Sequence, residues 1–328
     1  MPLMSAAPQW GLLATLVTMP ALSHTWGDPE RYPKSEGAND DRGDVEVLRD
    51  LRYREGASKS WRLDLARKKQ GSAKPRPAIV VIHGGGWLEG DKSSFASGKD
   101  AVPGNIVDFA KLGFVAVTIN YRLSTEANFP AALHDCKCAV RWLRAHAKEY
   151  GADPDRIGAY GNSAGGHLAL LLGLTGEEAA PEADSQFREY SSRVQAVVSD
   201  SGPVDLVYQY QHEQLKEVIR RFMGGPLGGI RTVLYRKASP AYQIRPGAPP
   251  LLLIYGVEDE QVPVETADQF VVASRQAGLR DVSYYRLASV GHCPHSLVRV
   301  PALRAIVNDF FIRTVQREGK VPRTNGAR

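Results

Sequence analysis

From residue 78 onward, short runs rich in Val, Ile, Leu and aromatic residues alternate with longer segments of helical periodicity. Six such runs occur, at residues 78–82, 114–120, 156–161, 194–199, 251–256 and 282–287. They are largely continuous apolar stretches rather than alternating ones, which is typical of parallel strands buried on both faces. The pattern therefore predicts an α/β fold with a mainly parallel central sheet and helices on both faces.

The segments between and before these runs add two details. Residues 130–151 begin with proline and end with glycine, as helices often do, residues 263–278 repeat this arrangement, and residues 303–311 are apolar at helical spacing. Upstream, residues 45–54 and 61–66 alternate between apolar and polar side chains around a break that contains glycine. This alternation predicts an antiparallel hairpin at the start of the sheet.

Composition narrows the class of protein. The 328 residues are 43% hydrophobic and 23% charged, which allows a sizeable core and excludes disorder, collagen and coiled coil. The net charge is +5, but no dense Lys/Arg stripe with interleaved aromatic residues occurs, so nucleic acid is not an expected partner. The three cysteines, Cys136, Cys138 and Cys293, have no zinc-site spacing and form no disulfide scaffold. No metal site is expected.

The N-terminal segment allows two interpretations. Residues 10–22 are an apolar run that is too short for a transmembrane helix and ends in small residues, as signal peptides do. However, no Lys or Arg precedes the run, and Pro20 interrupts it. We expect residues 1–23 to be a cleaved signal peptide, which implies a secreted or periplasmic protein without a stable membrane anchor. An N-terminal arm packed on the body of a cytoplasmic protein is the alternative.

The rest of the chain divides by composition. Residues 24–44 are rich in Gly, Asp, Glu and Pro and predict a linker, and residues 45–316 form one folded domain. The longest insertion between predicted strands, at residues 205–242, is a candidate cap over a functional site. Residues 317–328 carry an excess of basic side chains, for which a solvated, frayed tail is the expected structure.

Residues 161–166 read Gly-Asn-Ser-Ala-Gly-Gly and lie between an expected strand and an apolar helical segment. A serine with glycines two positions to either side, at a strand-to-helix junction, is typical of a nucleophile elbow. Such a turn lifts the Ser163 hydroxyl above the sheet at a helix N-terminus, which favours developing negative charge. A glycine-rich turn with Ser163 as a helix cap is the alternative, but the strand before and the helix after favour the nucleophile.

The string HGGGW at residues 83–87 directly follows another expected strand. Acyl transfer passes through a tetrahedral oxyanion that needs preorganised N–H donors, and successive glycines let a backbone turn its N–H groups into a pocket. A phosphate-binding loop is the rival interpretation, but neither of the usual glycine-rich phosphate motifs is present here. His83 is expected to brace this loop rather than to act as a base.

A serine nucleophile needs an imidazole to take its proton and a carboxylate to orient that imidazole. Two late loops, residues 257–263 and 288–292, follow expected strands and contain these groups. They lie at the carboxyl ends of strands, where open α/β sheets collect their ligands. Asp259 is the expected carboxylate and His292 the expected base. The alternatives are the neighbouring side chains Glu258, Glu260 and His295.

Together these residues resemble the α/β-hydrolase superfamily. More narrowly, they resemble the carboxylesterases of the hormone-sensitive-lipase type and the bacterial bifunctional feruloyl and acetyl-xylan esterases. The likeness spans residues 45–316. Its ordered motifs are HGGGW at 83–87, NYRL at 120–123, GNSAGGHLA at 161–169, SGPVDL at 201–206, GVEDEQVP at 256–263 and GH at 291–292.

The resemblance implies an α/β-hydrolase fold and a role for each residue of the site. Ser163 resembles the nucleophile, His292 the general base and acid, and Asp259 the carboxylate that orients it. No cofactor is implied. The backbone N–H groups that resemble the oxyanion hole are those of Gly85, Gly86 and Ala164.

These expectations describe a serine esterase that works through an acyl-enzyme. Trp87 beside the glycine loop and the short insertion suggest an open, shallow pocket, with Trp87 in contact with a short-chain or polysaccharide-linked ester. A serine peptidase or acyltransferase is one alternative, and a non-catalytic binding scaffold is another. Two positions depart from the family pattern: Asn162 stands where relatives often carry Asp, Glu or an aromatic residue, and Cys293 where they often have Gly.

Overall fold

The computed structural model describes residues 43–96, 105–176, 186–211, 213–293 and 301–316. Four expectations lie wholly or almost wholly outside these residues. They concern the signal peptide at residues 1–23, the linker at residues 24–44, the tail at residues 317–328, and His295 as an alternative base.

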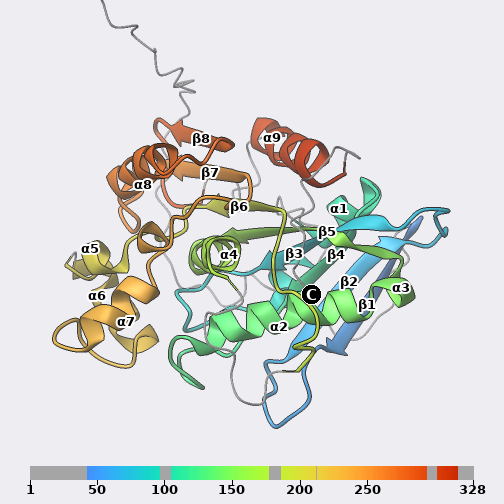
Figure 1. The fold of residues 1–328 in the computed structure, drawn as a ribbon, viewed down its shortest axis with the longest axis horizontal. Coiled ribbons are helices and arrows are strands. Elements are labelled where there is room, and N and C mark those ends of the chain that lie inside the picture. The colour runs from blue at the N-terminus through green and yellow to red at the C-terminus, as the bar shows by residue number, and fades with distance from the viewer. Residues whose placement is uncertain (1–42, 97–104, 177–185, 212, 294–300, 317–328) are drawn as a thin grey trace, which may run out of the picture.

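Within the described residues, eight strands form one sheet in the order β1-β2-β4-β3-β5-β6-β7-β8 (Figure 1). The strands are β1 (Val45–Arg52), β2 (Arg62–Lys68), β3 (Arg76–Ile82), β4 (Val115–Ile119), β5 (Ala152–Asn162), β6 (Ala196–Asp200), β7 (Leu251–Gly256) and β8 (Val282–Leu287). β2 pairs antiparallel with both β1 and β4, and the other neighbouring strands are parallel. The predicted mainly parallel sheet with an antiparallel hairpin at its start is confirmed.

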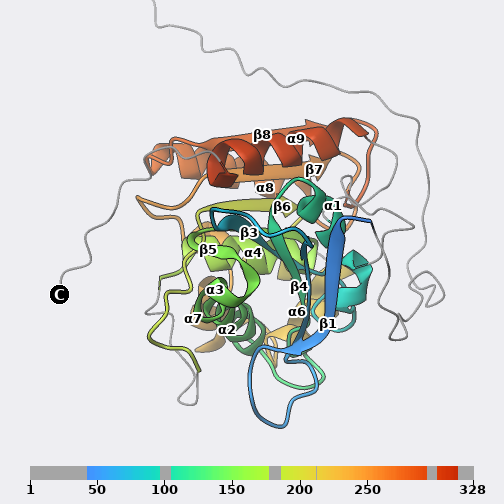
Figure 2. The ribbon, with the colours of Figure 1, turned by 90° about the vertical axis from the view of Figure 1, so that its right-hand side faces the viewer.

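Helices cover both faces of the sheet (Figures 1 and 2). One face carries α1 (Ile106–Lys111) and α9 (Pro301–Phe311), which continues into η4 (Ile312–Gln316). The other carries α2 (Ala131–Ala145), α3 (Ala147–Tyr150), α4 (Ala164–Leu174) and α8 (Val264–Gln276). Between β6 and β7 the chain forms α5 (Leu206–Tyr210), α6 (Glu213–Phe222), α7 (Arg231–Lys237) and the short η3 (Pro240–Tyr242). Another short helix, η2 (Lys92–Phe95), follows β3.

The core explains why the strand sequences are continuously apolar. Along β3, Val80 and Ile82 pack into the cluster on the α2, α4 and α8 side, whereas Ile79 and Val81 pack into the cluster on the α1 and α9 side. All four side chains are fully buried. Successive residues of a strand point to opposite faces, so a strand between two helical layers needs apolar side chains at every position.

Two helical details differ from the prediction. The helical segment expected over residues 130–151 begins after Pro130 and ends at Gly151 as predicted, but it is interrupted at His146, which separates α2 from α3. The short helix α1 was not predicted at all. In the described part of the chain, no helix has both the length and the apolar character needed to cross a membrane.

Candidate active site

Ser163 occupies the tight turn between β5 and α4. Its φ and ψ angles are 51° and −123°, a strained backbone conformation for a residue with a side chain, which costs on the order of 1–3 kcal/mol. The flanking glycines are required by space. A Cβ on Gly161 would lie 2.2 Å from the carbonyl oxygen of Gly165, and one on Gly165 would lie 2.1 Å from that of Ile82. The Ser163 N–H donates to the Asp200 carbonyl at 2.7 Å, which ties the turn to β6.

Asp259 lies in the turn between β7 and α8, with its side chain fully buried. One carboxylate oxygen, Oδ1, accepts hydrogen bonds from the backbone N–H groups of Gln261 and Val262, at 2.9 and 2.8 Å. These bonds orient the carboxylate so that Oδ2 lies 2.7 Å from Nδ1 of His292, which follows β8. The neighbouring Glu258 and Glu260 are exposed.

The turns that follow β5, β7 and β8 bring Ser163, Asp259 and His292 into one hydrogen-bonded chain. Nε2 of His292 lies 2.9 Å from the Ser163 hydroxyl oxygen. When Nδ1–H donates to the ionised carboxylate, Nε2 carries the lone pair and accepts the hydroxyl proton. The arrangement can therefore remove a proton from Ser163 and hold the resulting imidazolium beside a buried carboxylate.

The glycine loop, residues 83–87, passes directly over this serine. A Cβ on Gly84 would lie 3.2 Å from the Ser163 Cβ, and one on Gly85, where φ is 103°, would lie 2.2 Å from the Glu89 carbonyl oxygen. Within the described ranges, no hydrogen bond takes up the three amides that the sequence predicts as oxyanion donors. These are the N–H groups of Gly85, Gly86 and Ala164.

His83 braces the base of this loop, as the sequence predicts. Its ring stacks on Tyr121 with 4.5 Å between centroids, and its Nδ1 lies 2.8 Å from the Gly84 carbonyl oxygen, to which it donates. The Tyr121 hydroxyl donates to the His83 carbonyl at 3.0 Å. Burial lowers the pKa of His83, so the imidazole is neutral. Sequence reasoning did not identify Tyr121, although it lies in the NYRL string.

Trp87 does not line an open pocket. Only 1% of its surface is exposed, and its ring stacks on Phe222 of α6 with 4.4 Å between centroids. A Cβ on the preceding Gly86 would lie 3.0 Å from Val218 of the same helix. The indole thus joins the glycine loop to the β6–β7 insertion instead of facing solvent. The expected contact between Trp87 and substrate does not fit this burial.

Cys293 supports the site through its backbone. Its N–H donates to the Ser201 hydroxyl at 3.0 Å, which anchors the chain immediately after His292. Burial raises the pKa of the Cys293 thiol well above its ordinary value, so the sulfur stays protonated and is a poor nucleophile. Sequence reasoning left the role of Cys293 open and missed Ser201, whose only signal was the SGPVDL string.

His167 lies on α4, one helical turn after Ser163, and is fully buried. Its Nδ1 accepts a hydrogen bond from the Trp87 indole N–H at 3.2 Å, and its Nε2 donates to the Ala238 carbonyl at 2.6 Å. Burial lowers the pKa of His167 to about 4. The sequence predicts no more than a core or surface role for this residue.

Acid should destabilise the fold through His167. The unfolded chain binds a proton there below about pH 6.5, whereas the folded chain binds it only below about pH 4. The free energy of unfolding therefore falls as the pH is lowered through this window, by on the order of 3 kcal/mol from this residue. We expect the free energy of unfolding, measured by urea titration at a series of pH values, to fall less between pH 6.5 and 4 in H167Q than in the wild type. The same dependence on pH in both proteins would contradict a buried neutral imidazole at His167.

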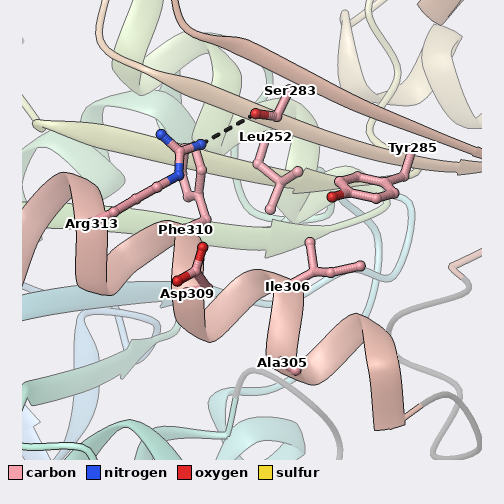
Figure 3. Close-up of a pocket in the computed structure, with 8 residues that line it drawn as sticks. All are labelled: Leu252, Ser283, Tyr285, Ala305, Ile306, Asp309, Phe310 and Arg313. Carbon is pink, nitrogen blue, oxygen red and sulfur yellow. Dashed lines mark hydrogen bonds between the residues drawn. The ribbon is translucent and has the colours of Figure 1, made fainter. Parts of the chain in front are cut away.

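A surface cavity of about 290 Å³ lies away from the three hydrogen-bonded residues, between α9 and strands β7 and β8 (Figure 3). Leu252 and Phe310 contribute its apolar wall, and Arg313 donates to the Ser283 hydroxyl at 3.2 Å. The cavity belongs to the face covered by α9, and none of the three residues lines it. In the described ranges, no group of three His, Cys, Asp or Glu side chains could hold a metal ion.

Comparison with known proteins places these features in a family. The BD-FAE family model matches residues 63–273. The chain is 32% identical to esterase LipC of Mycobacterium tuberculosis over 285 residues, which cover 85% of this chain and 68% of LipC. It is 34% identical over 218 residues to the probable carboxylic ester hydrolase LipM of the same organism, covering 66% of this chain and 49% of LipM. The chain thus spans only about half the length of LipM.

Solved structures agree with these sequence matches. A bifunctional GH43-CE protein of Bacteroides eggerthii superposes with a TM-score of 0.71 at 26% identity, covering 82% of this chain and 38% of that one. The propionate-bound esterase Est2 of Thermogutta terrifontis superposes with a TM-score of 0.65 at 27% identity. The match covers 84% of this chain and 97% of Est2. Fold, motif order and sequence identity lead to the same conclusion: the chain belongs to the BD-FAE family of α/β-hydrolase esterases.

Proposed function

We propose that this protein is a serine carboxylesterase that hydrolyses short-chain or carbohydrate-linked acyl and aryl esters through an acyl-enzyme. The observation that carries the proposal is the hydrogen-bonded chain from Asp259 through His292 to Ser163, at 2.7 and 2.9 Å. It lies beneath a loop in which the amides of Gly85 and Gly86 have no hydrogen-bond acceptor among the described residues. A binding scaffold would need neither a strained serine nor a histidine oriented by a buried carboxylate.

The chemistry follows from this geometry. Ser163 Oγ attacks the ester carbonyl carbon while His292 Nε2 takes the hydroxyl proton, and the carbonyl oxygen becomes an oxyanion held by backbone N–H groups. Asp259 stabilises the imidazolium. His292 then gives its proton to the departing alkoxide, which leaves the acyl group on Ser163. A water molecule then loses a proton to His292 and attacks the acyl carbon. The bond from this carbon to Ser163 Oγ breaks, and His292 returns the proton to Oγ, which releases the acid and restores the serine.

The substrate class rests on the relatives and on the insertion. The similar structures include a bifunctional GH43-CE protein and an esterase with bound propionate. Here α6 packs against the glycine loop through Val218 and Phe222, so we assign the insertion at residues 205–242 as a cap over the site. Secretion through the predicted signal peptide at residues 1–23 would bring the enzyme to polysaccharide-linked esters outside the cell.

The test is hydrolysis of p-nitrophenyl esters of increasing acyl length, with and without a serine-directed phosphonate. We expect turnover of the acetate and butyrate esters, its loss after phosphonate treatment, and the label on Ser163 by mass spectrometry. Turnover with the label on another residue would overturn the site. Label without turnover would favour the alternative of a peptidase or acyltransferase, and neither label nor turnover would favour the scaffold.

A further inference from the structure

His167 is bonded to three parts of the molecule whose relative positions matter for the proposed mechanism: the nucleophile turn, the glycine loop and the insertion. Its backbone N–H donates to the Ser163 carbonyl at 3.0 Å, in the first turn of α4. Its side chain bonds the indole of Trp87, at the end of the glycine loop, and the carbonyl of Ala238, directly after α7. Its ring also meets the edge of Phe222 of α6, with 5.7 Å between centroids.

The glycine loop needs such support because its backbone is strained. Gly85, Gly86 and Trp87 have successive φ angles of 103°, 59° and 58°. The first two positions are glycine, but Trp87 carries a side chain in the left-handed region, which costs on the order of 1 kcal/mol or more. A strained conformation persists only where surrounding contacts hold it. The indole N–H bond to His167 and the stacking on Phe222 hold the ring, and the backbone N–H and hydroxyl of Ser124 hold the Trp87 carbonyl.

The two hydrogen bonds define one protonation state of His167. The indole N–H can only donate, so Nδ1 must carry a lone pair, and the Ala238 carbonyl can only accept, so Nε2 must carry the proton. The neutral ring with the proton on Nε2 satisfies both partners, and the other neutral tautomer satisfies neither. Asparagine places an amide oxygen near the Nδ1 position, and glutamine places an amide N–H near the Nε2 position. The two substitutions therefore separate the two bonds.

We propose that His167 is a positioning residue for ester hydrolysis: it locks the Trp87 end of the glycine loop, and with it the amides of Gly85 and Gly86, over Ser163. The inference rests on the proposed function. It goes further because it assigns a role in transition-state geometry to a side chain whose hydrogen bonds go to Trp87 and Ala238, outside the proton-transfer chain. The bond to Ala238 extends the same lock to the cap, so the loop and the cap share one buried side chain on the helix that begins directly after Ser163.

The expected effect is on kcat. A shift of the loop amides weakens their bonds to the oxyanion, which forms only in the transition state, and leaves ground-state binding of the ester nearly unchanged. H167Q removes the acceptor for Trp87, and we expect it to lower kcat by about 10- to 100-fold with a similar KM. H167N keeps that acceptor and should retain most of the rate. W87F keeps an aromatic ring but removes the donor, and should resemble H167Q.

The experiment measures kcat and KM for p-nitrophenyl acetate in the full chain, with rates divided by the concentration of sites titrated with a phosphonate. H167Q, H167N, W87F and the double variant H167Q/W87F are compared, with circular dichroism and melting temperature for each. The inhibition constant of phenylboronic acid, which forms a tetrahedral adduct with an active serine, is measured in parallel. We expect this inhibition constant to rise in H167Q and W87F by the same factor as kcat falls. We also expect kcat of the double variant to equal that of each single variant.

Three results separate the possible failures. If the wild type is not titrated at Ser163, the proposed function fails and the role of His167 fails with it. If titrated H167Q and W87F turn over at the wild-type rate, the positioning role alone is overturned. Independent, multiplying losses in the double variant would also overturn it, because the two side chains would not act through one bond. If H167Q does not fold, W87F and H167N still test the proposal. Lower turnover per titrated site in W87F than in H167N supports it, and equal turnover in the two variants overturns it.

Discussion

Ser163→Ala should lower kcat/KM for short-chain esters by about 10⁴-fold or more, to the level that binding and backbone amides alone provide. The methyl group of alanine cannot attack a carbonyl, and the hydroxyl that lies 2.9 Å from His292 Nε2 is the one removed. The measurement is the hydrolysis of p-nitrophenyl acetate by purified wild type and variant, together with the stoichiometry of phosphonate labelling.

The fold of this variant should be unchanged. The turn at residue 163 is held by its backbone N–H bond to Asp200 and by the glycines at 161 and 165, none of which involves the hydroxyl. Loss of Oγ removes one hydrogen bond of the described structure, the one to Nε2 of the partly exposed His292. Circular dichroism and melting temperature close to those of the wild type are the control. Substantial turnover by a correctly folded S163A would show that Ser163 is not the nucleophile.

Asp259→Asn should lower kcat by about 10³- to 10⁴-fold. The carboxylate currently accepts two backbone N–H bonds on Oδ1 and one imidazole N–H on Oδ2. An asparagine that keeps its oxygen toward the backbone amides presents an NH₂ group to Nδ1, which stabilises the tautomer with the proton on Nε2. His292 then cannot accept the serine proton, and no negative charge stabilises an imidazolium.

The neighbouring Glu258 provides a matched control for this prediction. Glu258→Gln makes the same change from carboxylate to amide one residue away, on an exposed side chain, whereas the carboxylate 2.7 Å from His292 Nδ1 is that of Asp259. We expect it to change kcat by less than about twofold, since exposed charges contribute little. Steady-state kinetics of both variants test the assignment. A greater loss in E258Q than in D259N would move the orienting carboxylate to Glu258.

The sheet and the elbow could be predicted because local pattern determines them. Strands β7 and β8 have the predicted bounds, since their apolar runs end sharply at turn residues. Ser163 could be identified because only glycines at 161 and 165 let β5 and α4 approach so closely. In contrast, α1 has six residues, too few to show helical periodicity, and begins with a side-chain cap from Asn105.

The contacts between distant segments could not be read from the chain. Trp87 was expected at a pocket wall because it follows the glycine loop, but it packs on Phe222, which is far away in the sequence and belongs to the insertion. From the sequence His167 had a core or a surface role on a helix, and its contribution depends on the side chain of Trp87 and the carbonyl of Ala238, which come from two distant segments. Neither contact leaves a periodic or spacing signal in the sequence.

The sequence by itself determined the fold class, the position of the strained serine and the two loops that carry a carboxylate and a histidine, because each depends on residues that are close together in the chain. Only the tertiary structure decided that Asp259, rather than Glu258 or Glu260, turns toward His292, and that Trp87 is buried beneath the insertion. The physical reason is that hydrogen-bond direction and burial are set by the meeting of segments from separate strands. Local pattern specifies which residues lie at the ends of those strands, whereas packing specifies which of them meet.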